Sequence, residues 1–167
     1  KKRLISLSLV TILALCLVFP LSACGKNKEK LTSYDIKAVL DYDNKTVSAE
    51  MKVNYINATD GALDEVCFHL YPSAFRKDAR FRPVEENMRA DAYPNGESYG
   101  GITVTQVSVD GQEKSVVIEG EDEDILVVET EEILPGESVE IGIDFALIIP
   151  NVRHRFGHYN GIINLGN

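Results

Sequence analysis

The stretch Val139-Glu-Ile-Gly-Ile-Asp-Phe-Ala-Leu147 carries an apolar residue at every second position. Successive side chains of a β-strand point to opposite faces, so this alternation predicts a strand with one face in a core and the other in water. The rest of residues 34–167 contains no comparably long run with the 3.6-residue spacing of an amphipathic helix. This stretch therefore indicates a β fold.

The same period of two recurs on the N-terminal side of this stretch. Expected strands cover residues 34–42, 47–55, 66–70, 102–109, 116–118, 125–128 and 139–147. The first two should form a hairpin of half-buried strands, and a parity slip near Gln106 predicts a bulge. Asp110-Gly111 is a strong hairpin-turn signal. About seven short strands with short turns predict an all-β fold, either a β-sandwich or strongly twisted antiparallel sheets.

Composition limits the number of domains and the kinds of partner. The chain has 167 residues, 44% of them hydrophobic and 26% charged, and a formal net charge of −9. Without residues 1–23, which carry three positive charges, 167 − 23 = 144 residues with a charge of −9 − 3 = −12 remain. That length fits one domain. A domain with this negative charge is repelled by nucleic acid and by anionic membrane surfaces. Electrostatic binding to either is therefore excluded.

Residues 1–23 have the order of an export signal, which we expect to be helical. Lys1-Lys2-Arg3 precedes an apolar run, Pro20 and the small residues that end at Ala23. Leu21-Ser-Ala-Cys-Gly25 resembles the lipobox of bacterial lipoproteins, in which the cysteine thiol receives a diacylglycerol and becomes the new N-terminus. We therefore expect Cys24 to be lipidated and residues 24–33 to be a polar tether. The domain at 34–167 would then lie outside the cytoplasm, anchored to the bacterial cell membrane by its lipid.

A long polar stretch from Pro72 to Tyr99 interrupts the strand pattern, and we expect it to contain short helical structure or a functional loop. Its four arginines are a candidate partner or interdomain surface, because arginine can bind carboxylates in bidentate geometry. They are Arg76, Arg80, Arg82 and Arg89. The alternative is that acidic residues of the same loop, Asp78, Glu85, Glu86 and Asp91, neutralise them in local salt bridges.

Other residues could carry chemistry, but their patterns favour structural roles. His154 and His158 are four residues apart, yet Pro150 and Gly157 disfavour a helix and no glutamate follows His154. With His69 they are expected to be surface or loop histidines. Glu121-Asp-Glu-Asp124 lacks the ligand pattern of a calcium loop and is expected to be a solvated turn. Cys67, the only cysteine of the expected domain, is expected to be a small buried hydrophobe.

Four stretches, taken in order, resemble the N-terminal domain of the aminopeptidase N family of zinc metallopeptidases. They are Phe68-His-Leu-Tyr-Pro-Ser-Ala-Phe75, Gly100 to Gly111, Leu134-Pro-Gly-Glu137 with Val139 to Pro150, and Arg155-Phe-Gly157 with Ile163-Asn-Leu-Gly-Asn167. The resemblance covers nearly all of residues 34–167. It implies a saddle-shaped β domain that packs on a separate catalytic domain.

In that family the catalytic domain holds zinc with H-E-x-x-H and a later glutamate, and the metal activates the water that attacks the peptide bond. None of these residues occurs here, so the resemblance implies a fragment that is inactive alone and needs no cofactor. The parent would release N-terminal residues from peptides, and the missing catalytic domain would be the partner of residues 34–167. The alternative is a free-standing extracytoplasmic β-sandwich lipoprotein that binds a ligand or a protein.

Overall fold

The computed structural model describes residues 31–166, which form ten strands and three short helical segments. The elements in chain order are β1 (Ser33–Asp41), β2 (Thr46–Ile56), β3 (Leu63–His69), the 3-10 helices η1 (Tyr71–Phe75) and η2 (Glu86–Met88), α2 (Arg89–Ala92), β4 (Gly101–Val109), β5 (Gln112–Lys114), β6 (Val117–Glu119), β7 (Ile125–Ile133), β8 (Ser138–Ile148), β9 (Phe156–Tyr159) and β10 (Ile162–Leu165). The all-β prediction is confirmed. The predicted signal, Cys24 and the first part of the tether lie outside the described residues.

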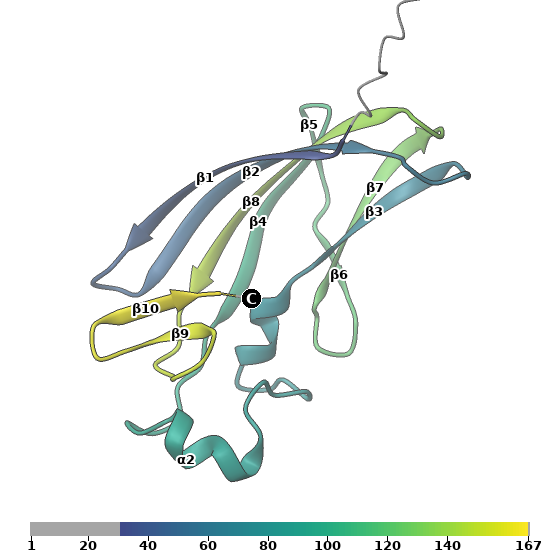
Figure 1. Cartoon of the computed structure of the whole chain (residues 1–167). Coiled ribbons are helices and arrows are strands. Elements are labelled where there is room, and N and C mark those ends of the chain that lie inside the picture. Colours follow the sequence, from purple (N-terminus) through teal and green to yellow (C-terminus); the bar gives the residue numbers. More distant parts are fainter. Residues whose placement is uncertain (1–30, 167) are drawn as a thin grey trace, which may run out of the picture.

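The strands form three antiparallel sheets. The largest has five strands in the order β1-β2-β8-β4-β5, a second has the order β3-β7-β6, and β9 and β10 form a hairpin. Figure 1 shows β1, β2, β8 and β4 as one curved sheet, with β3 and β7 beneath one end of it and the β9–β10 hairpin beneath the other. We call the side of the five-stranded sheet that faces these elements its inner face.

A hydrophobic core joins the five-stranded and three-stranded sheets. Val53 of β2, Val107 of β4 and Ile141 of β8 belong to the same buried cluster as Leu126 and Val128 of β7. All five side chains are less than 2% exposed. The period-two pattern of β8 is therefore confirmed as a set of inner-face residues, and the two sheets form a sandwich over this half of the molecule.

A second, separate core covers the other end of the inner face. We call residues 72–99 the excursion. Most of this cluster consists of Phe75 from η1, Val84 and Ala92 from the rest of the excursion, and Val152 and Phe156 near β9. Val47 of β2 packs in the same cluster and is 5% exposed. The stretch predicted to contain short helical structure does contain it, as η1, η2 and α2. It also contributes side chains to a core.

The prediction that β1 is half-buried is wrong. β1 pairs with β2 over nine residues, as the hairpin prediction requires, but every residue of β1 is exposed. The register places Tyr34, Ile36, Ala38 and Leu40 beside Val53, Met51, Ala49 and Val47 of β2, on the inner face. We call Tyr34, Ile36, Ala38, Leu40 and Tyr42 the β1 row. Its side chains stay largely in water because β1 is the edge strand of the sheet and neither core extends over it.

The turn signals behave as local chemistry requires. Asp110 and Gly111 have positive φ values of 48° and 77° and join β4 to β5, and the pairing of β4 with β8 shifts between Val104 and Gln106. The predicted hairpin turn and bulge are both confirmed. The β9–β10 hairpin was not predicted, although its turn, Asn160-Gly161, has the same positive φ values of 48° and 78°.

Asn57 joins two turns at one end of the sandwich. Its fully buried side chain donates hydrogen bonds from Nδ2 to the carbonyl oxygens of Ile133 (2.8 Å) and Gly61 (2.7 Å). Its Oδ1 accepts hydrogen bonds from the backbone N–H and the hydroxyl of Thr59 at 2.9 and 2.7 Å. The Asn57-Ala-Thr59 sequence matches a glycosylation acceptor, but burial and four hydrogen bonds leave this amide inaccessible in the folded domain.

Candidate functional site

Two of the four candidate arginines bind the acidic turn between β6 and β7. Arg76 forms an ion pair with Glu123, and Arg80 forms one with Glu121. Arg76 Nε also lies 3.8 Å from Asp78. The expected pairing within the loop thus accounts for only part of the charge compensation, since the strongest partners come from a turn some forty residues later in the chain.

The acidic cluster forms the predicted turn between β6 and β7, with Glu121 and Glu123 exposed, but Asp122 is not solvated. It is 6% exposed, and its carboxylate accepts hydrogen bonds from the backbone N–H groups of Arg80 (2.7 Å) and Phe81 (2.9 Å). These backbone hydrogen bonds hold the pKa of Asp122 below its ordinary value. The turn folds inward because the excursion supplies unpaired N–H donors there, so Asp122 fastens the long excursion to the three-stranded sheet.

The other two arginines lie in the same excursion. Arg89 pairs with Glu86 at 3.2 Å and with Glu97, while the Arg82 guanidinium donates a hydrogen bond to the Lys77 carbonyl at 2.9 Å. Arg76, Arg82 and Arg89 line one crevice of only about 10 Å³, which Glu97 also lines. That volume holds no more than a water molecule. Their role as a partner surface therefore stays a prediction, weakened by the carboxylates that already neutralise three of the four.

The three histidines do not come together. His69 is exposed and stacks on Tyr71 at a ring distance of 5.2 Å, His154 lies before β9 next to Phe75, and His158 lies within β9. Burial, then the charge of Arg155, lowers the pKa of His154, so its imidazole is neutral at pH 7. Among residues 31–166, no three His, Cys, Asp or Glu side chains lie close enough to hold a metal ion.

Cys67 is exposed, not buried as predicted. Alternation along β3 turns Val66 and Leu70 inward and Cys67 outward, and β3 is an edge strand, so no neighbour covers that side. The pKa of the Cys67 thiol is nevertheless raised, mainly because neighbouring atoms remove part of its water. The negative charges of Glu65 and Glu119 raise it further. The thiol is therefore protonated at neutral pH and a poor nucleophile.

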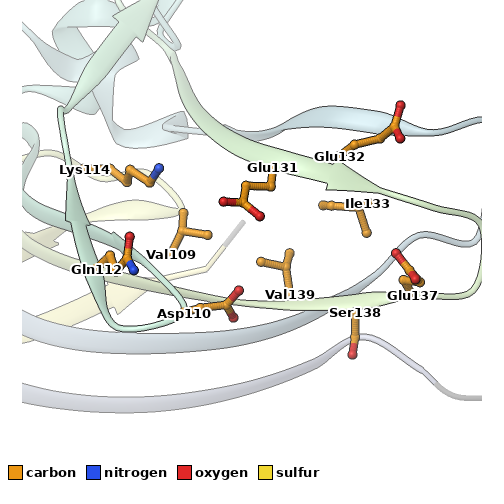
Figure 2. A pocket seen from close by; sticks show the side chains of 10 residues that line it. All are labelled: Val109, Asp110, Gln112, Lys114, Glu131, Glu132, Ile133, Glu137, Ser138 and Val139. Atoms are coloured by element: carbon orange, nitrogen blue, oxygen red, sulfur yellow. The ribbon is translucent and has the colours of Figure 1, made fainter.

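A hollow of about 290 Å³ is lined by Val109, Ile133 and Val139 together with polar side chains. Figure 2 shows these side chains around the hollow. Acidic residues line it, but two of their carboxylates serve the turns. Asp110 accepts a hydrogen bond from the backbone N–H of Glu140 at 3.0 Å, and Glu137 accepts one from Leu134 at 3.0 Å. The Glu132 side chain points away from the hollow (Figure 2). These side chains shape the turns and converge on no single point.

A larger pocket of about 530 Å³ lies under the inner face, between η1 and the β9–β10 hairpin. We call it the inner-face pocket. Five segments distant in sequence line it: Tyr71, Pro72 and Phe75 of η1, Pro83 of the excursion, Leu147 of β8, His154, Arg155 and Phe156 at the start of β9, and Leu165 with Gly166 at the end of β10. Its volume lies within the range of small-molecule pockets. Because its walls come from separate segments, sequence reasoning offered no signal for it.

Two glycines allow close backbone contacts near the pocket, Gly157 of β9 with the loop that precedes it and Gly100 with the end of β8. A Cβ at Gly157 would lie 2.4 Å from the Val152 carbonyl oxygen, and a Cβ at Gly100 would lie 2.3 Å from the Ile148 carbonyl oxygen. Neither position leaves space for a side chain. The β9–β10 hairpin is further held by the Tyr42 hydroxyl, which donates to the Gly161 carbonyl at 2.7 Å. These contacts fix the wall of the pocket that carries His154, Arg155 and Phe156.

In residues 31–166 no helix is long and apolar enough to cross a membrane. Comparison of the chain with protein-family models and with curated proteins found no match.

Proposed function

We propose that residues 34–167 are the non-catalytic leading β domain of a membrane-anchored, zinc aminopeptidase-like enzyme. A catalytic domain in the same polypeptide would hold the zinc and release N-terminal residues from peptides. Lipid on Cys24 would attach the protein to the outer side of the bacterial cell membrane. The four sequence stretches that resemble the aminopeptidase N family motivate the proposal, and the all-β sandwich is the fold that this resemblance implies.

The observation that carries the proposal is the β1 row. Tyr34, Ile36, Leu40 and Tyr42 are 47–59% exposed, although they share the inner face with fully or nearly buried residues of β2 such as Val53. A row of apolar side chains along an edge strand is costly in water unless another surface covers it. The catalytic domain of the same chain is the occupant that we assign to it.

The reading frame beyond Asn167 tests the proposal directly. An H-E-x-x-H sequence with a glutamate about twenty residues later is expected. A stop codon directly after Asn167 would refute it. The purified fragment should release no amino acid from aminoacyl substrates, and zinc-dependent release by the fragment would refute the non-catalytic role.

A matched pair of variants tests the docking surface in the longer polypeptide. Ile36→Asp places a charge in the β1 row, whereas Val39→Asp places the same charge on the opposite face of β1, where Val39 is 69% exposed. Ile36→Asp should increase protease cleavage between the domains and lower the unfolding temperature of the longer polypeptide. Val39→Asp should do neither. Equal effects of the two variants would exclude the β1 row as the contact.

One observation favours the alternative function, an extracytoplasmic binding module. The inner-face pocket is large enough for a small molecule and is mainly apolar. A lipid-anchored domain with such a pocket could capture a ligand without any catalytic partner. A stop codon after Asn167 together with saturable ligand binding would favour this function over the first.

A further inference from the structure

The inner-face pocket has a rigid apolar interior. Phe75 and Phe156 are 7% and 8% exposed, and their rings lie 5.3 Å apart in a tilted arrangement. The imidazole of His154 meets the Phe75 ring at 5.5 Å. Aromatic walls already held by a core lose little conformational entropy when a ligand binds, which favours an apolar or aromatic group in this space.

The charge around the pocket has one sign. Arg155 lines it and is exposed, while no carboxylate is found among the described residues that line it. In the described part of the chain, Arg76, Arg80 and Arg89 each pair with glutamate, but no Asp or Glu forms an ion pair with Arg155. A guanidinium without a carboxylate partner, beside an apolar space in an acidic protein, is available to an anion.

The number and kind of donors define the anion. A single guanidinium matches the planar, singly charged carboxylate with two parallel hydrogen bonds. A phosphate monoester carries close to two charges and ordinarily needs more donors than this pocket offers. The neighbouring His154 supplies no second charge, because burial and the charge of Arg155 lower its pKa.

We propose that the inner-face pocket binds an apolar or aromatic chain that ends in a carboxylate, with the apolar part packed against the wall formed by Phe75 and Phe156 and the carboxylate on Arg155. Two sources share this chemistry: the C-terminal residue of a peptide and a fatty acid. This site is separate from the β1 row and does not depend on the proposed docking of a catalytic domain.

The test is a titration of each probe into the purified full chain, with binding measured by calorimetry and by NMR. The peptide probe is N-acetyl-phenylalanine and the fatty-acid probe is octanoate. N-acetyl-phenylalaninamide and 1-octanol are the controls, since they keep the apolar part but lack the charge. A ligand of this size that fits the pocket should bind with a Kd of about 1 mM or tighter.

Two variants separate the role of the charge from general effects. Arg155→Gln should weaken binding of the acid by about tenfold, since it removes a charge-assisted hydrogen bond. Arg153→Gln is the matched control, because Arg153 lies two residues away, contacts Tyr159 at 2.9 Å and does not line the pocket. It should leave the Kd of the acid unchanged.

Each outcome decides the proposal. Preference for N-acetyl-phenylalanine supports a peptide C-terminus, preference for octanoate supports a fatty acid, and comparable binding of both supports the shared chemistry. Equal affinity for acid and uncharged control, no effect of Arg155→Gln, or no saturable binding up to about 10 mM would overturn it. Unchanged circular dichroism of Arg155→Gln excludes misfolding as the cause of any loss.

Discussion

Replacing Gly157 by alanine should destabilise the domain through a steric clash at the wall of the inner-face pocket. A Cβ on Gly157 would lie 2.4 Å from the carbonyl oxygen and 2.6 Å from Cγ1 of Val152. Ordinary contacts begin at 3.4 Å, so the hairpin must move by about 3.4 − 2.4 = 1.0 Å. Val152 is 1% exposed and belongs to the second core, so neither partner can yield freely. Overpacking of this kind costs about 1–3 kcal/mol.

Urea unfolding followed by circular dichroism measures this cost. Gly61→Ala is the matched control, since a Cβ there meets nothing within 4 Å, and its stability should change by no more than about 1 kcal/mol. Phe156 precedes Gly157 and lines the pocket, so Gly157→Ala should also weaken the binding of N-acetyl-phenylalanine. If Gly157→Ala unfolds at the same urea concentration as Gly61→Ala, the close approach of the hairpin to Val152 is not real.

Four further substitutions test other parts of the structure. Asn57→Ala should lower the free energy of unfolding by about 2–4 kcal/mol in urea titrations, because it leaves the buried carbonyl of Ile133 and part-buried groups near it without partners; a loss below about 0.5 kcal/mol would contradict the network. Val53→Ala should cost about 2 kcal/mol, whereas Ile36→Ala should change the stability of residues 31–166 by less than about 1 kcal/mol, because Val53 is fully buried and Ile36 is 54% exposed. The folded-state pKa of Asp122 lies below the ordinary 3.8, so near and below pH 3.8 the unfolded chain binds more protons than the folded one. Asp122 therefore loses its contribution to stability as the pH falls through this range, and Asp122→Asn should make stability less dependent on pH there. Parallel curves of stability against pH for the two proteins would contradict the contact of Asp122 with Arg80 and Phe81.

Much of the fold was predictable because it follows from local chemistry. The period of two in residues 139–147 identified β8, and the parity slip near Gln106 identified the bulge in β4, since each depends only on which way successive side chains point. Asp110-Gly111 predicted its turn because positive φ values are easiest for these residue types. The same rule applied to Asn160-Gly161 would have predicted the β9–β10 hairpin.

The candidate sites were less predictable, because they depend on segments that are distant in sequence. The four arginines stood out because they lie in the long polar stretch from Pro72 to Tyr99, but Arg76 and Arg80 bind the β6–β7 turn, which no local pattern connects to them. The inner-face pocket gave no signal at all. Its walls come from five segments, and only the folding of the β9–β10 hairpin onto the sheet brings Arg155 beside Phe75.

By itself the sequence determined that residues 34–167 form a β protein and where most of its strands and several of its turns lie. Its acidic net charge is the reason why we expect no nucleic-acid partner. Only the tertiary structure decided which strands are edges. For that reason the apolar residues of β1, which have the local pattern of buried positions, are exposed, while the acidic Asp122 is buried. Alternation states which residues share a face of a strand, but burial depends on whether another part of the chain covers that face.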